Sequence, residues 1–117
     1  MKHCTIYHNP RCSKSRQTLA LLEERGIHCH VVKYLDEPPS AETLLGVLEA
    51  LGLRPYELLR RGESEFKALD ITAETSDVVV INAMATHPIL IERPIVVVGT
   101  RAAIGRPPES VLALFDD

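Results

Sequence analysis

The sequence has no tryptophan, and only 4% of its 117 residues are aromatic. Its three cysteines are an odd number and form no Cys-x-x-Cys pair, so neither a disulfide framework nor a structural zinc site is expected. No apolar run approaches the length of about 18 residues that a membrane-spanning helix needs, and the residues after Met1 do not form a signal peptide. These absences favour a cytoplasmic protein with reduced thiols.

The chain also lacks an excess of positive charge. Its 16 acidic residues outnumber 13 basic ones, for a net charge of −3, which disfavours a general nucleic-acid-binding protein. Nine of the basic residues are arginines, whose planar guanidinium groups suit the recognition of oxyanions. With 45% apolar and 25% charged residues, the whole chain, 1–117, is expected to form a single domain with its own core.

The hydrophobic pattern predicts strands that alternate with helices. Strands are predicted over 4–7, 27–35, 93–98 and 101–104, and helices over 13–25, 41–51, 55–60, 63–69 and 107–115. The segment 75–87 has features of both a strand and a helix, and its Ser76-Asp77 start favours the helix. The order is therefore β-α-β, a block of helices, and β-β-α. This is the order of an α/β, thioredoxin-like fold with a helical insertion between its two halves.

One cysteine, Cys12, stands between the end of a predicted strand and the start of a predicted helix. The free N–H groups and the dipole of a helix N-terminus favour negative charge, and therefore favour a thiolate or a bound oxyanion. Arg11, Lys14, Arg16 and, if it is protonated, His8 add positive charge close by. These neighbours favour a reactive thiolate over a buried, inert thiol.

The remaining candidates have simpler interpretations. Cys4 and Cys29 lie in predicted strands and are expected to pack in the core, since nothing in the sequence places them in bonding geometry. His28 and His30 face away from Cys29 on a strand, so the three residues are not expected to bind a metal. Taken singly, the arginines at positions 60, 61, 93 and 106 are typical of surface charges.

Several motifs together resemble those of the glutaredoxin-coupled arsenate reductases, the ArsC family, and in particular its short YfgD-like branch. They keep their order over essentially the whole chain: 5–10, Cys12, Ser15-Arg16, Thr18-Leu19, Tyr34-Leu35, 38–40, 58–60, 87–91, 93–97 and 105–107. Each motif is weak by itself, and the set is specific for the family.

The resemblance implies a thioredoxin-like fold with a helical insertion over about 40–87, in which 75–87 is helical. It implies that Cys12 is the catalytic nucleophile. It assigns oxyanion binding to Arg60, Arg93 and Arg106. It assigns supporting positions to His8, Ser15, Arg16 and Pro94, with a cis peptide bond between Arg93 and Pro94. The stretch from Arg93 to 105–107 is shorter than in the established reductases, so Arg101 is an alternative to Arg106 as the third arginine.

The implied reaction is the reduction of arsenate to arsenite. The Cys12 thiolate attacks arsenic, glutathione then attacks the adduct, and glutaredoxin regenerates the enzyme. Arsenate or a similar oxyanion, glutathione and glutaredoxin are the implied partners, and nucleic acid and membranes are not. No tightly bound cofactor is implied, and glutathione is a co-substrate.

Two other functions fit the same fold. Cys12-Ser13-Lys14-Ser15 has the form of a single-thiol glutaredoxin-like site, which suits a general glutathione-dependent thiol oxidoreductase. That activity does not require three arginines. The Spx-like regulators bind RNA polymerase through this fold, but they usually carry a Cys-x-x-Cys switch, which Ser15 excludes here.

Overall fold

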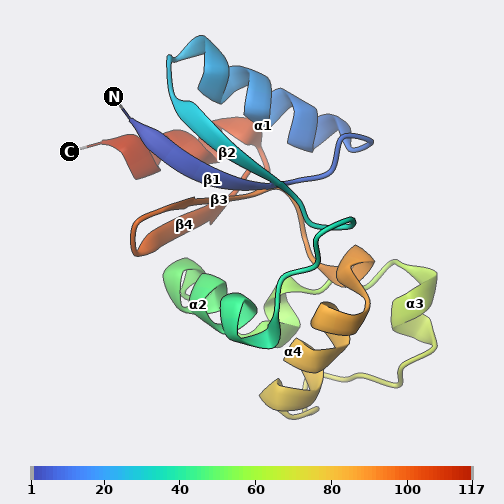
Figure 1. Cartoon of the computed structure of the whole chain (residues 1–117). Coiled ribbons are helices and arrows are strands. Elements are labelled where there is room, and N and C mark those ends of the chain that lie inside the picture. Colours follow the sequence, from blue (N-terminus) through green and yellow to red (C-terminus); the bar gives the residue numbers. More distant parts are fainter. Residues whose placement is uncertain (1, 117) are drawn as a thin grey trace. The chain divides into compact units, whose positions relative to one another are not determined.

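A mixed four-stranded sheet is the centre of the first of two units into which the chain folds (Figure 1). This unit combines the residues up to Glu37 with those from Arg93 onward, and the structure, a computed structural model, describes residues 2–116. Its strands are β1 (His3–His8), β2 (His28–Lys33), β3 (Ile95–Val98) and β4 (Arg101–Ile104), in the spatial order β2-β1-β3-β4. β1 runs parallel to β2 and antiparallel to β3, and β4 is antiparallel to β3.

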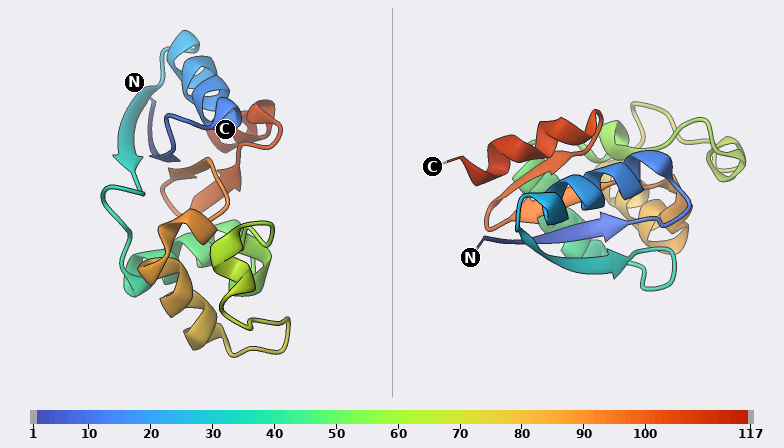
Figure 2. Two further views of the ribbon diagram at one scale, coloured as in Figure 1. Left: turned by 90° about the vertical axis from the view of Figure 1, so that its right-hand side faces the viewer. Right: turned by 90° about the horizontal axis from the view of Figure 1, so that it is seen from above.

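Two helices, α1 (Ser13–Glu24) and η3 (Pro108–Phe115), pack beside each other and against this sheet (Figure 2). Helix α1 buries Ser15, Thr18 and Leu22, which recur at helical spacing and so lie on one face. The core of the unit is apolar and consists of Cys4, Ile6, Leu22, Ile27, Val96, Val111 and Leu114. No helix within residues 2–116 combines the length and the apolar character needed to cross a membrane.

The second unit, 38–92, is helical and contains the stretch in which an insertion was expected. Its elements are α2 (Ala41–Leu51), η1 (Pro55–Leu58), α3 (Ser64–Lys67), α4 (Asp77–Thr86) and η2 (Pro88–Leu90). Ser40 caps α2 by accepting a hydrogen bond from the Thr43 N–H at 3.1 Å, as its residue type indicates. The helical prediction for 75–87 is confirmed by α4, which packs against α2, η1 and η2.

The backbone around the prolines agrees with some of the predictions and differs from others. The peptide bond between Arg93 and Pro94 is cis, as predicted, and a second cis bond joins Arg106 to Pro107. The strand predicted over 93–98 begins at Ile95, because proline has no N–H to donate to the sheet. The helices predicted over 55–60 and 107–115 are shorter 3₁₀ helices, each with proline in its first turn.

Candidate active site

Cys12 occupies the N-cap position of α1, immediately after the loop that leaves β1. Asn9 shapes this loop, because its carbonyl oxygen accepts the Cys12 N–H and its Oδ1 accepts the Arg11 N–H, both at 3.0 Å. The Cys12 carbonyl oxygen then accepts the Arg16 N–H, also at 3.0 Å, which closes the first turn of the helix. The thiol is thereby held at the positive end of a helix of 12 residues.

Two arginines from the end of the chain complete the surroundings of the thiol. The Nη2 group of Arg106 donates to the Cys12 Sγ atom at 3.5 Å, and its Nε group donates to the Arg93 carbonyl oxygen at 2.7 Å. The Arg93 guanidinium also lies close enough to Cys12 to lower the pKa of its thiol. Arg93 and Arg106, which are 81 and 94 positions from Cys12 in the sequence, therefore meet at its sulfur, because β3 and β4 lie in the same sheet as β1.

The pKa of the Cys12 thiol is lower than the ordinary value for cysteine. Burial is the largest single influence and raises this pKa. The backbone N–H of Ser15, the Arg93 guanidinium and the backbone N–H of Lys14 oppose burial and together outweigh it. Donors and positive charge stabilise the thiolate, which is the nucleophilic form.

A buried hydrogen-bond cluster supports the loop from behind. The Ser15 Oγ atom accepts the Asn9 N–H at 3.0 Å and lies 2.6 Å from His8 Nδ1. Burial is the main cause of a lowered pKa for His8, and the positive charges of Lys33 and Arg16 add to the effect. The imidazole is therefore neutral near pH 7, so His8 does not add the positive charge that the sequence allowed for it. Its contact with Ser15 instead fixes the loop next to Cys12.

Gly105 allows the end of β4 to approach α1 closely. A methyl group added at this position would lie 2.5 Å from Thr18 Oγ1 and 2.8 Å from Pro94 Cγ, which is too close for non-bonded atoms. The Gly105 N–H donates to the Pro94 carbonyl oxygen at 2.9 Å. This hydrogen bond holds the neighbouring Arg106 in place. No periodicity in the sequence indicates the close approach at Gly105.

Comparisons with known proteins agree with this geometry. A model of the ArsC family matches residues 7–114. The chain belongs to the ArsC family. It is 49% identical to "Uncharacterized protein YfgD" of Escherichia coli over 115 residues, which is 97% of each chain. It is also 45% identical to an arsenate reductase of Neisseria meningitidis, over 98% of this chain and 100% of that one.

A solved structure described as an arsenate reductase from Vibrio cholerae is also similar. It has a TM-score of 0.93 and 49% sequence identity, over 96% of this chain and 97% of that one. The thioredoxin-like α/β fold that the element order predicts is therefore the fold of this ArsC-family chain.

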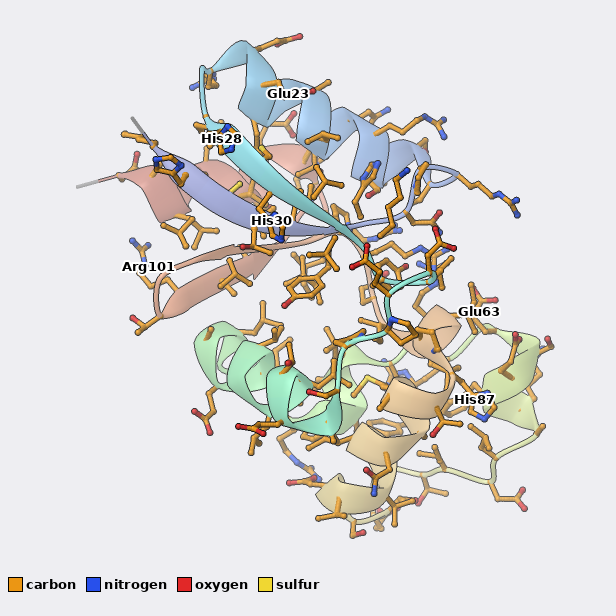
Figure 3. The ribbon with its side chains drawn as sticks, viewed as in Figure 1. Glu23, His28, His30, Glu63, His87 and Arg101 are labelled. Carbon is orange, nitrogen blue, oxygen red and sulfur yellow. The ribbon has the colours of Figure 1, made fainter. Side chains whose placement is uncertain are left out.

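The structure separates the two candidates for the third arginine of this ArsC-family chain. Arg106 lies beside the Cys12 sulfur, at the end of β4 where Gly105 approaches α1. Arg101 begins β4 at the turn after β3, where it is labelled in Figure 3, and its Nη2 group donates to the Ala113 carbonyl oxygen at 3.1 Å. Arg106 is therefore the better candidate for binding an anion at Cys12.

Arg60 belongs to the helical unit, where two carboxylates hold its side chain. Its Nε group lies 3.2 Å from Glu63 Oε1, and its Nη1 group lies 2.9 Å from Glu92 Oε1. Its backbone N–H donates to the Leu90 carbonyl oxygen at 2.7 Å, next to a β-bridge between Leu59 and Ile91. These contacts fix the orientation of the guanidinium within its unit, and its role as an oxyanion ligand stays a prediction.

The other positive side chains near Cys12 are exposed. Arg11, Lys14 and Arg16 all face solvent, and the Arg16 Nη1 group donates to the Pro10 carbonyl oxygen at 2.9 Å. Arg16 therefore closes the outer side of the loop that carries Cys12. This contact fits the supporting position that the family resemblance implies for it.

Proposed function

We propose that this chain is an arsenate reductase in which Cys12 is the only nucleophile and glutathione with glutaredoxin is the reductant. The observation that carries the proposal is the arrangement of Arg93 and Arg106 around the Cys12 thiol at the start of α1. Similarity to the Neisseria and Vibrio proteins, which are described as arsenate reductases, supports the choice of substrate.

The same groups that stabilise the thiolate suit the binding of a tetrahedral oxyanion. Guanidinium groups present paired N–H donors to oxygen atoms, and the N–H groups at the start of α1 add further donors. Arsenate binding beside a thiolate brings two anions together. The positive charges of Arg93 and Arg106, and in the proposal that of Arg60, offset this repulsion.

In the proposed reaction, the Cys12 sulfur forms a bond to arsenic and one arsenate oxygen leaves as water after protonation. The thiol of glutathione then attacks the adduct, and glutaredoxin supplies the second thiol. Two thiols are oxidised to one disulfide while As(V) accepts two electrons and leaves as arsenite. The chain itself provides one thiol at the site, since Ser15 stands where a second cysteine would be.

The remaining two cysteines do not take part in this scheme. Cys4 lies near the start of β1, whereas Cys12 follows the loop after its end. Cys29 lies opposite Cys4 on the neighbouring strand β2, and both are free thiols. An external reductant is therefore required, and reduced glutathione is its expected source.

A coupled assay tests the proposal. Purified protein, glutathione, glutaredoxin, glutathione reductase and NADPH are mixed, and NADPH oxidation is followed with and without arsenate. Oxidation that depends on arsenate and disappears in Cys12→Ser is the expected result. A folded protein whose Cys12 reacts with iodoacetamide but which gives no arsenate-dependent oxidation would contradict the proposed substrate.

The same assay separates arsenate reduction from general thiol exchange. A mixed disulfide of glutathione with a small thiol replaces arsenate as the oxidised substrate. If this disulfide is reduced at equal rates by the wild type and by Arg93→Ala, and arsenate is not reduced, the chain is a general thiol oxidoreductase.

A further inference from the structure

A second pair of thiols lies in the sheet, at residues that the proposed reaction does not use. Cys4 on β1 and Cys29 on β2 are direct partners in the parallel register. The Cys4 thiol donates to the Cys29 Sγ atom, and the two sulfurs are 3.6 Å apart. In Figure 3 the label of His28 marks the residue next to Cys29 on β2.

Both cysteines of this pair adjoin the apolar core, and Cys29 is the more exposed of the two. Cys4 is only 6% exposed and belongs to the core cluster with Ile6, Leu22 and Ile27. Cys29 is partly exposed and lies on β2, which is an edge strand of the sheet. One thiol is therefore anchored in the core while its partner is within reach of a small solute.

Both thiols are held in their protonated form. Burial is the main reason that the pKa of Cys4 rises to about 12, and burial also raises the pKa of Cys29. A cation that requires thiolates is poorly served by such a pair. An uncharged ligand that reacts with thiols, and that carries the thiol protons away, avoids this cost.

The composition of the site excludes a zinc site of the usual kind. Structural zinc needs four ligands, and the part of the chain described, 2–116, holds no group of three or more metal-binding side chains. His28 and His30 alternate with Cys29 along β2, so they point to the opposite face of the sheet. The site therefore offers two sulfur atoms to its ligand.

We infer that Cys4 and Cys29 form a two-sulfur binding site for trivalent arsenic, the product of the proposed reaction. The identity of this occupant rests on the proposed function. Arsenous acid, which is uncharged near neutral pH, exchanges two hydroxyl groups for the two sulfurs. Two As–S bonds form, two As–O bonds break, and the two thiol protons leave with the hydroxyl groups as two molecules of water.

This exchange needs no oxidant, because arsenic remains trivalent and each sulfur keeps its oxidation state. A bridging arsenic atom also fits the observed spacing better than a disulfide does. A disulfide would bring the sulfurs from 3.6 Å to about 2.05 Å. An arsenic atom between them leaves the sulfurs separated. The product of catalysis thus has a second binding place on the enzyme, away from Cys12.

Titration with sodium arsenite in a Cys12→Ser background tests the inference, because this variant lacks the catalytic thiol. We expect one equivalent to bind, detected by intact-protein mass spectrometry and by the near-ultraviolet absorption of As–S bonds. Cys29→Ala and Cys4→Ala, each added to this background, should weaken binding about 100-fold, because the second sulfur no longer acts intramolecularly. His28→Ala, on the other face of β2, is the matched control and should bind normally.

Circular dichroism and thermal unfolding establish whether each variant is folded. If Cys4→Ala does not fold, Cys29→Ala and Cys29→Ser carry the test at the partly exposed position. Absence of arsenite binding to Cys12→Ser, or binding that survives the loss of Cys29, overturns the inference. The coupled assay on the wild type is read independently, so a failure of arsenate reduction is distinguished from a failure of this site.

Discussion

At the scale of single residues, the ionisation of Cys12 connects the structure to reactivity. Because its pKa is lowered in the folded chain, the thiolate stabilises the fold at pH values above the pKa of the unfolded thiol. This contribution is lost as the pH falls through the folded pKa. The raised pKa values of Cys4 and Cys29 leave Cys12 as the thiol that ionises first.

We therefore predict that iodoacetamide modifies one residue with a pH midpoint below that of free cysteine. The rate of alkylation is measured by mass spectrometry between about pH 5 and 10, a range that includes the ordinary thiol pKa of about 8.5. Cys12→Ser should abolish this reaction phase. A midpoint at or above that of free cysteine would contradict a lowered pKa for the Cys12 thiol.

Arg106 and Arg101 provide a second prediction at this scale. Arg106→Ala removes a charged donor from Cys12, whereas Arg101→Ala removes a contact with η3 at the other end of β4. A hydrogen bond to a charged group contributes about 1.5–3 kcal/mol, which corresponds to a decrease of about 10- to 150-fold in kcat/KM for arsenate. Arg101→Ala should remain within about twofold of the wild type. Equal losses in the two variants would remove Arg106 from the anion site.

Sequence reasoning reached Cys12 because its signals are local: a strand end, a helix start and positive neighbours. It did not separate Arg101 from Arg106, because that choice depends on which end of β4 meets α1. It allowed Cys4 and Cys29 to lie on neighbouring strands, but it predicted only that they pack in the core and did not place their thiols in contact. Their contact depends on the register of β1 against β2, which no single segment encodes.

At the scale of elements, the close approach of β4 to α1 depends on the missing side chain at Gly105. Gly105→Ala places a methyl group against Thr18 and Pro94, so either α1 or the segment that carries Arg106 must shift. Overpacking of this kind costs about 1–3 kcal/mol of unfolding free energy. We expect this loss in urea unfolding, together with a lower kcat/KM for arsenate.

Gly46→Ala is the matched control for this change. Gly46 lies inside α2, and nothing lies within 4 Å of an added methyl group. This substitution should raise the unfolding free energy by about 0.5–1 kcal/mol, because alanine favours a helix more than glycine does. If Gly105→Ala leaves the unfolding free energy unchanged, β4 and α1 can move apart without an energetic cost, which would contradict the prediction.

The elements themselves were largely readable from periodicity and caps. Ser40 and Gly52 delimit α2 as their residue types indicate, and Gly52 adopts a φ of 71° at the helix end. The 3₁₀ geometry of η1 and η3 was not readable, because an apolar spacing of three or four residues fits a short helix of either kind. Segment 75–87 was ambiguous for a related reason, since its four consecutive β-branched residues, 78–81, suit a strand equally well.

At the scale of the whole molecule, the chain returns to its sheet after the helical unit, so residues from both ends of the sequence build the surroundings of Cys12. The family resemblance assigned Arg60, in the helical unit, to the same oxyanion. Composition and periodicity carry no information on such long-range relations. Motifs that keep their order over the whole chain carry this information, because they relate the chain to folded members of the family.

Substitution of Arg60 tests whether the helical unit contributes to substrate binding. Arg60 is half-buried between Glu63 and Glu92, whereas Arg54 in the same unit forms an exposed ion pair with Asp77 at 3.6 Å. If Arg60 binds the oxyanion, Arg60→Gln should raise KM for arsenate about tenfold, as expected for the loss of about 1.4 kcal/mol. Arg54→Gln is the matched control, and it should leave KM unchanged because exposed ion pairs contribute little.

The pH profile of Cys12 alkylation separates a substrate ligand from a residue that acts on the thiol. Because the pKa of Cys12 is lowered by Ser15, Arg93 and Lys14, all in the unit that holds the sheet, Arg60→Gln should leave its alkylation midpoint unchanged. Equal KM values in Arg60→Gln and Arg54→Gln would confine the anion ligands to the unit that holds Cys12. A raised KM with an unchanged midpoint would instead mean that the helical unit recognises arsenate while the sheet unit activates the nucleophile.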